Sequence, residues 1–203
     1  MLKLKTFKGG FDRNLSYVLY DDESKEAAII DISVEPKILI DFIKEEGLKL
    51  KFAVIMHSHF DHLNGYDYYR EEGIKLVASE QIKKAVDLKL KDGDELGSGK
   101  YSNLGLGKHK LKVIHTPGHL FDAICLLVEG KLFTSDTLFI GCCGRTDLDG
   151  ADPEEMKKSL EKIKFLPDET IIYPGHDYSS VPFTTLGEQK ESNSYLRTIP
   201  TGQ

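Results

Sequence analysis

The stretch HSHFDH, at residues 57–62, places three histidines and one aspartate within six positions. The whole chain of 203 residues has only seven histidines, so this concentration is notable, and it directly follows the apolar run KFAVIM. Imidazole and carboxylate groups together suit first-row metals such as zinc, iron or manganese, whereas calcium prefers mainly oxygen ligands. The alternative is a loop that is rich in histidine by chance, and the close spacing of these four residues directly after an apolar run argues against it. We interpret the stretch as part of a transition-metal site.

Further candidate ligands follow other strand-like runs. His115 ends LKVI, Asp136 ends KLFTS and His176 ends TIIYPG. Strand ends on one edge of a packed sheet converge in space, so distant residues can meet in one cleft. The predicted ligands are His57, His59, Asp61, His62, His115, Asp136 and His176. They exceed one tetrahedral shell and predict two metal ions that share a bridging carboxylate and an activated water.

Two histidines stand outside this set. His109 lies in the polar stretch GKHK, and we expect it to be a surface or hydrogen-bonding residue. His119, in TPGHL, lies four residues after His115, and its part in the site is left open.

Composition predicts one soluble domain over residues 1–203, because 40% hydrophobic and 30% charged residues are ordinary globular values. A formal charge of -6 argues against nucleic acid as the main partner. No apolar stretch reaches the length of a membrane helix, roughly 18 residues, and MLKLKTFKGG lacks a signal-peptide core. We therefore expect a cytoplasmic protein without membrane contact, and three cysteines suit that reducing compartment.

Hydrophobic periodicity predicts the elements that position these residues. Strands are expected at 14–20, 26–32, 50–56, 74–79, 111–116, 123–130, 131–136 and 169–176. Helices are expected at 35–47, 66–73, 80–88, 152–165 and 186–196, with Asp152 as an N-cap and Pro153 in the first helical position. This order predicts an α/β protein in which two sheets pack face to face with helices outside.

The motifs resemble one known family. HSHFDH is similar to the H-x-H-x-D-H signature of the metallo-β-lactamase superfamily, and HTPGH, SDTLF and YPGH resemble its later ligand motifs in the same order. The resemblance spans roughly residues 15 to 180 and implies a four-layered αβ/βα sandwich with two mixed sheets. SDT stands here where the family more commonly has GDT.

The resemblance also implies how the ligands divide. It assigns the first metal to His57, His59 and His115, the second to Asp61, His62 and His176, and the bridging position to Asp136. Asp31 matches an aspartate that usually supports a ligand histidine from behind.

LFIGCCGRTDL and YPGHDY resemble the glyoxalase II group of hydroxyacylglutathione hydrolases, and TTLGEQKESNSYL more closely resembles the persulfide dioxygenases. We favour a hydrolase, because Phe60 is typical of hydrolases at its place in the motif. Two divalent ions, zinc or else iron or manganese, would activate a water that Asp61 orients for attack on a thioester. The alternative is a dioxygenase with one Fe(II) on His57, His115 and Asp136 that oxidises glutathione persulfide or a similar persulfide. A metal-binding protein without catalysis is a third interpretation.

Arg145 and Tyr178 are candidate substrate-binding residues, because a guanidinium can pair with a carboxylate and a phenol can donate a hydrogen bond. The structural alternatives are an ion pair of Arg145 with Asp147 or Asp149, and simple packing of Tyr178. The vicinal cysteines 142 and 143 are expected to line the cleft wall without binding metal. An exposed strand or the terminal SNSYLRTIP would support a homodimer.

Overall fold

The computed structural model describes residues 1–199, which form two six-stranded sheets. The first sheet has the order β1 (Leu2–Gly9), β2 (Asn14–Asp21), β3 (Glu26–Ile30), β4 (Lys49–Ile55), β5 (Leu76–Ser79) and β6 (Leu88–Leu90). The second has the order β12 (Thr184–Thr185), β11 (Ile171–Pro174), β10 (Lys131–Ser135), β9 (Ile124–Val128), β8 (Leu111–His115) and β7 (Glu95–Leu96). Both are mixed, since β3 to β6 and the pair β10–β11 run parallel while the other neighbours are antiparallel.

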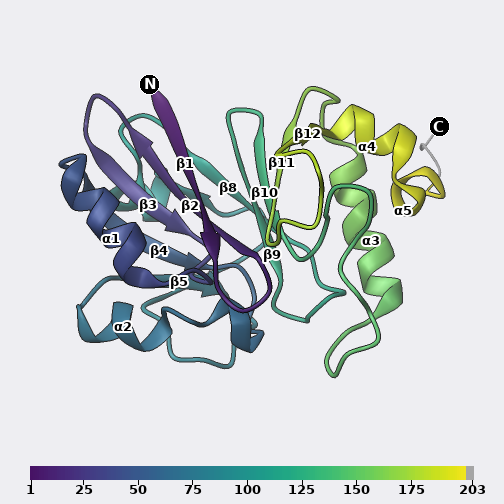
Figure 1. Ribbon diagram of the computed structural model, residues 1–203, viewed down its shortest axis with the longest axis horizontal. Helices are drawn as coiled ribbons and strands as arrows, with labels where there is room; N and C mark the ends of the chain where they lie inside the picture. Colours follow the sequence, from purple (N-terminus) through teal and green to yellow (C-terminus); the bar gives the residue numbers. More distant parts are fainter. Residues whose placement is uncertain (200–203) are drawn as a thin grey trace.

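Helices cover the outer faces of both sheets (Figure 1). They are α1 (Pro36–Glu45), α2 (Tyr66–Glu71), α3 (Pro153–Lys164), α4 (Leu186–Ser192) and α5 (Ser194–Arg197), with short 3₁₀ helices η1 (Phe60–His62) and η2 (Gly99–Leu104). In Figure 1, α1 and α2 lie beside the first sheet, and α3, α4 and α5 lie beyond the second.

Three apolar clusters hold these layers together. Phe52 and Phe133 belong to the cluster between the two sheets. Leu39 of α1 packs with Ile55 on the outer face of the first sheet, and Ile163 of α3 belongs to the cluster outside the second. The predicted four-layered αβ/βα sandwich is therefore confirmed.

Local sequence explains where the α3 helix begins. The Asp152 carboxylate accepts hydrogen bonds from the backbone N–H groups of Glu154 and Glu155, and Pro153 follows in the first turn. This cap satisfies donors that have no partner within the helix. The predicted start of this helix is confirmed.

Two predicted helices differ from the structure, and the strands β1, β6, β7 and β12 were not predicted. Residues 80–87 form turns instead of a helix, because Leu88–Leu90 pair in parallel with β5 and the Asp87 carboxylate accepts the Leu76 N–H. The helix predicted at 186–196 breaks at Asn193, whose side chain caps α5 and donates to the Cys142 carbonyl. The alternating residues 2–9, not predicted as a strand, pair along the edge of the first sheet as β1.

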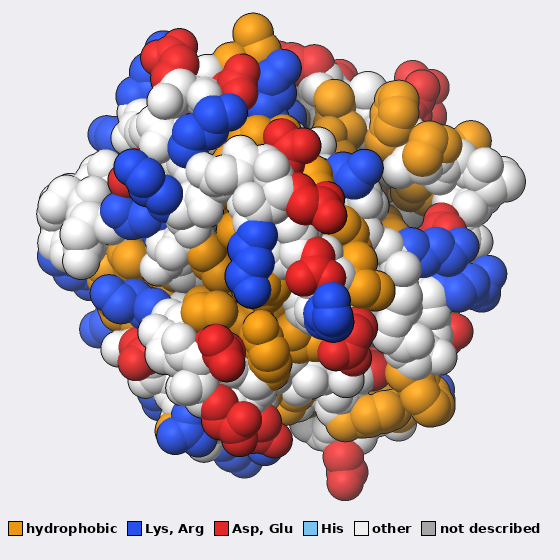
Figure 2. Space-filling view, turned by 60° about the vertical axis from the view of Figure 1, so that its left-hand side comes forward, with side chains coloured by type: hydrophobic (Ala, Val, Ile, Leu, Met, Phe, Trp, Pro, Cys, Tyr) orange, Lys and Arg blue, Asp and Glu red, His pale blue; other side chains and the backbone are white. Residues whose placement is uncertain are grey.

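Charged side chains of both signs are interspersed on the face drawn in Figure 2, with hydrophobic side chains among them. Within residues 1–199, no helix combines the length and the apolar character needed to cross a bilayer.

Candidate metal centre

Three overlapping groups of side chains each bring three potential ligand atoms within 4.8 Å of one another. The first group is His57, His59 and His119, the second group is Asp61, His62 and His176, and a third group of His57, His62 and Asp136 joins them. They lie where β4, β10 and β11 end, so the predicted convergence of strand ends is what assembles them. Six of the seven predicted ligands are in these groups.

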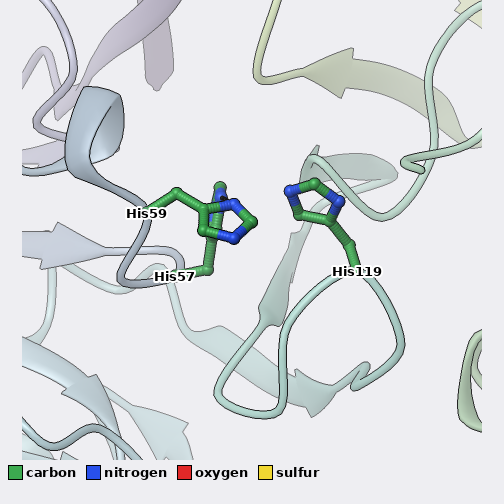
Figure 3. A group of neighbouring side chains, drawn as sticks. All are labelled: His57, His59 and His119. Atoms are coloured by element: carbon green, nitrogen blue, oxygen red, sulfur yellow. Dashed lines mark hydrogen bonds between the residues drawn. The ribbon is translucent and has the colours of Figure 1, made fainter. Parts of the chain in front are cut away.

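The first group joins two loops. His57 and His59 come from the loop after β4, and the ring of His119 faces them from a separate loop (Figure 3). His57 Nε2 lies 3.2 Å from His59 Nδ1. The three rings thus direct nitrogen atoms toward a common point, which is the arrangement that a metal ion with nitrogen ligands requires.

Asp136 connects the first group to the second. One of its carboxylate oxygens, Oδ2, lies 3.5 Å from His119 Nε2 and 3.2 Å from His176 Nε2. The other, Oδ1, lies 3.3 Å from His62 Nε2. In the second group, Asp61 Oδ2 lies 3.4 Å from His62 Nε2. Asp136 therefore lies between the histidines of the two groups.

His115 does not belong to any of these groups. His119, four residues later, lies with His57 and His59, where His115 was predicted to lie. The Nε2 atom of His115 lies 3.0 Å from the Phe121 carbonyl oxygen, and its backbone N–H donates to Asp92. The turn after β8 carries the chain back over the sheet edge. Gly118 in this turn has φ +141°, and a Cβ there would lie 2.3 Å from the Met156 Cα. The tight turn explains why the histidine four residues later reaches the centre.

The histidine rings are oriented by hydrogen bonds to their other nitrogen. The partners of Nδ1 are Asp31 Oδ2 for His62 (2.8 Å), the Asp12 carbonyl for His176 (2.8 Å), the Arg145 carbonyl for His119 (2.9 Å) and Ser135 Oγ for His57 (3.3 Å). Such bonds fix the tautomer and leave Nε2 free to bind a metal. Asp31 lies behind His62, as the resemblance implied.

Three supporting residues were not predicted. Asn14 donates to Asp61 Oδ2 (2.9 Å), Asp122 Oδ1 accepts the Ser58 N–H between two ligand histidines (3.3 Å), and Ser135 donates to Asp31 Oδ2 (2.8 Å). For Ser135 the sequence did carry a signal, because SDT replaces the commoner GDT. Its φ of +43° is a conformation that glycine adopts readily, and its hydroxyl makes two hydrogen bonds that glycine cannot.

The electrostatics of the centre favour a bound cation. His119 Nε2 and Asp136 Oδ1 are buried without a hydrogen-bond partner among the described residues, which is costly unless another group meets them. Burial lowers the pKa of His62, but Asp31, Asp136 and Asp61 outweigh it and raise that pKa to about 10. Burial likewise raises the pKa of Asp136, yet His62 and His176 hold it well below its usual range. The donor set and the buried atoms without a hydrogen-bond partner therefore fit a divalent metal ion.

A cavity of about 200 Å³ opens beside this centre. Its walls are His119, Asp136, Phe139, Cys142, Cys143, Arg145 and Tyr178. Both predicted substrate-binding residues thus lie at the cleft, and each also has a structural partner. Arg145 pairs with Asp147 through Nε and Nη2 (2.7 and 2.9 Å). Tyr178 stacks on His176 with ring centroids 4.8 Å apart and donates to Asp12.

The environment of the two cleft cysteines favours their thiol form. Burial raises the pKa of Cys142, and burial together with its neighbour raises that of Cys143 to about 11. Both line the wall of the cavity, as predicted.

Comparison with known proteins relates this centre to established enzymes. Persulfide dioxygenase ETHE1, mitochondrial, of Homo sapiens is 34% identical over 188 residues, covering 89% of this chain and 70% of the relative. Hydroxyacylglutathione hydrolase of Maricaulis maris (strain MCS10) is 33% identical over 172 residues, covering 82% and 63%. The crystal structure of ETHE1 from Myxococcus xanthus superposes with a TM-score of 0.85 at 27% identity, covering 95% of this chain and 83% of that one.

The family model described as the Metallo-beta-lactamase superfamily matches residues 9–176. This range contains all of the ligand groups and most of both sheets. The sequence motifs, the sandwich of two mixed sheets and the His/Asp metal centre agree with that match. The chain belongs to the metallo-beta-lactamase superfamily.

Proposed function

We propose that the protein is an iron-dependent persulfide dioxygenase. This was the alternative interpretation of the sequence, which favoured a thioester hydrolase. The observation that carries the proposal is one set of side chains, His57, His119 and Asp136. Two imidazoles and one carboxylate are the ligands of non-haem Fe(II) oxygenases, which keep the remaining positions open. The 34% identity to a persulfide dioxygenase supports this choice over other oxygenases.

The three side chains are held in place for this task. His57, His119 and Asp136 are all buried, whereas His59 and Asp61 are only partly so. The His57 ring is oriented by Ser135, and the His119 ring by the Arg145 carbonyl. A set fixed by backbone and buried contacts keeps its geometry when substrate enters.

In the proposed reaction, one persulfide, one dioxygen and one water give a thiol, sulfite and two protons. The terminal sulfur loses four electrons and dioxygen gains them, while the sulfur–sulfur bond breaks and the thiol keeps its carrier. Bound Fe(II) would supply the redox chemistry. The chain would position the sulfur in the cavity beside His119 and Asp136, where the rings of Phe139 and Tyr178 pack edge to face in the wall.

Thioester hydrolysis is the second candidate, and the intact second group favours it. Asp61, His62 and His176 direct ligand atoms to a common point, and Asn14 orients the Asp61 carboxylate. A second metal there would allow both ions to activate one water. The 33% identity to a hydroxyacylglutathione hydrolase supports this candidate.

Metal analysis after anaerobic purification tests the choice, combined with two assays on the same sample. We expect one iron per chain and oxygen uptake with glutathione persulfide. Two zinc ions per chain, with hydrolysis of S-lactoylglutathione and no oxygen uptake, would establish the hydrolase instead.

A further inference from the structure

Two phenylalanine side chains lie exposed on the Asp61 side of the metal centre. Phe11, in the turn between β1 and β2, is 79% exposed, and Phe60, in η1, is 71% exposed. Their ring centroids lie 5.2 Å apart, and the rings meet edge to face. Exposed apolar groups that gather together mark a site of interaction more often than single ones do. The pair therefore indicates a binding surface.

The outward position of Phe11 is built into its turn. The preceding Gly10 has φ +68°, and a Cβ there would lie 2.8 Å from the Ser33 carbonyl oxygen. On the other side, the Asp12 N–H donates to Asn14 Oδ1 (2.9 Å). These contacts hold the backbone before and after Phe11, so the ring stays at the surface.

A cavity of about 480 Å³ lies beside the two rings, within the range of about 300–1,000 Å³ that small-molecule sites usually have. Its walls are Gly10, Phe11, Glu35, Phe60, Asp61 and Asn64, and no lysine or arginine is among them. The Glu35 carboxylate does not cap α1, and the neighbouring Lys37 pairs with Asp41 instead. The walls therefore combine two phenyl rings with negative charge.

This combination of groups recognises an organic ammonium. A cation over a phenyl ring is attracted by the negative face of the ring, and a nearby carboxylate adds a charge attraction. An anionic group would be repelled by Glu35, and a neutral apolar group would gain nothing from it. The cavity is thus complementary to a small cation with an apolar surface.

Asp61 connects this cavity to the metal centre. It belongs to the second ligand group, and its Oδ2 atom lies 3.5 Å from His176 Nε2. Asp136 Oδ2 lies 3.2 Å from the same nitrogen, and Asp136 lines the cavity proposed for the reacting sulfur. The two cavities therefore flank one centre. A substrate with its sulfur beside Asp136 needs only a short spacer to place a second group beside Asp61.

We propose that the cavity lined by Phe11, Phe60 and Glu35 binds an ammonium group of the substrate, so that the enzyme selects persulfides with an amine a few bonds from the sulfur. The inference rests on the proposed function for the reacting group. The ammonium site itself depends on the lining of the cavity and is the same for either reaction at the metal centre.

Tetramethylammonium tests the site on the metal-loaded full chain, because it carries the cation and cannot coordinate a metal ion. We expect calorimetry to show that it binds more tightly than neutral tert-butanol. Phe11→Leu keeps an apolar side chain and removes the aromatic face, and it should raise the Kd of tetramethylammonium about threefold. Glu35→Lys turns an attractive charge into a repulsive one and should raise it about fivefold.

Two matched controls make the same changes away from the cavity. Phe165→Leu alters another exposed phenylalanine, at the end of α3, and Glu45→Lys alters the last residue of α1. Neither residue lines the cavity. The Kd of tetramethylammonium should stay within about 1.5-fold of the wild type in both.

Turnover connects the site to the substrate. The ratio of kcat/KM for 2-aminoethyl persulfide to that for 2-hydroxyethyl persulfide should be about threefold or more in the wild type and fall toward one in Phe11→Leu and Glu35→Lys. Tetramethylammonium that binds no more tightly than tert-butanol, Kd values equal in site and control variants, or a ratio that these variants leave unchanged would overturn the ammonium site. Binding that depends on Phe11 and Glu35, without turnover of any persulfide, would instead overturn the dioxygenase and leave the ammonium site standing.

Discussion

The two ends of the sandwich both contain a buried histidine between carboxylates, and they differ in what the ring nitrogens meet. At the end away from the metal centre, where β2 finishes, His109 Nδ1 lies 2.5 Å from Glu129 Oε1 and Nε2 lies 3.2 Å from Asp21 Oδ1. At the other end, His62 Nε2 lies 3.1 Å from His176 Nε2, and His119 Nε2 has no hydrogen-bond partner among the described residues.

This difference distinguishes a structural histidine from a metal ligand. Each nitrogen of His109 meets an acceptor, so its hydrogen-bonding capacity is used within the protein. At the metal centre, the Nδ1 atom of each oriented ring has a hydrogen-bond partner outside the centre. Its Nε2 atom faces several ring nitrogens and carboxylates and cannot form a hydrogen bond with each of them. The histidines at the two ends are alike in burial. They differ in whether the second ring nitrogen has a hydrogen-bond acceptor of its own.

Removal of the bridging carboxylate should have the largest effect. We expect Asp136→Ala to lose its metal and more than about 100-fold of its activity, since even residues behind the ligands typically contribute 10–100-fold. Metal analysis and oxygen uptake on the same preparation measure both losses. An active, metal-loaded Asp136→Ala protein would sink the whole site assignment.

Asp61→Asn should separate the two candidate reactions. Asp61 lies outside the set proposed for iron, so the variant should keep its iron and at least about a tenth of its oxygen uptake. Thioester hydrolysis by two metals would instead lose its water-orienting carboxylate and fall by about 100-fold or more. Oxygen uptake that vanishes together with the iron would show that the second group is part of the iron site.

Asp31→Asn should weaken iron binding by about 10–100-fold, because the amide is a weaker acceptor for the Ser135 hydroxyl that orients the proposed ligand His57. Chelator competition measures this affinity. Asn tolerates the positive φ of Asp31 (65°), so the fold should survive, which circular dichroism would check. Wild-type iron affinity in the variant would mean that the His57 ring needs no support from Ser135 and Asp31.

His109→Phe should change stability and leave the metal centre intact. It leaves Asp21 and Glu129 without their buried partner, and we expect a loss of about 1–3 kcal/mol in the free energy of unfolding. Denaturant unfolding of the metal-free protein measures it. A loss of metal in this variant would break the contrast between the two ends.

Lowering the pH should reveal a smaller effect on stability at the His109 end of the sandwich. The Ser24 N–H, together with the N-terminal ammonium and His109, holds the pKa of Asp21 well below its usual range. The folded state therefore binds fewer protons than the unfolded state, and Asp21 stabilises the protein above about pH 4 and loses this contribution as the pH falls further. Asp21→Asn should flatten the acid limb of a stability curve measured on metal-free protein. An unchanged acid limb would show that other groups determine it.

Sequence patterns were sufficient for the sandwich, because strand runs such as 50–56 and 131–136 carry continuous apolar signals. They also located six of the side chains that gather in the candidate metal groups, because those residues follow strands closely. The choice between His115 and His119 depends on a turn at Gly118 that packs against α3, and strand periodicity does not describe such a contact. Asn14 and Asp122 support the site through contacts 47 and 64 residues away in sequence, which no local pattern indicates.

The most direct test compares the metal retained by the wild type, His119→Ala and His115→Ala against one chelator after anaerobic loading with Fe(II). His119 faces His57 and Asp136, whereas His115 faces a backbone carbonyl, so the two variants remove the same group four residues apart. We predict that His115→Ala binds iron like the wild type and that His119→Ala loses about tenfold or more in affinity. Loss of iron in His115→Ala, with full retention in His119→Ala, would contradict the metal centre described here.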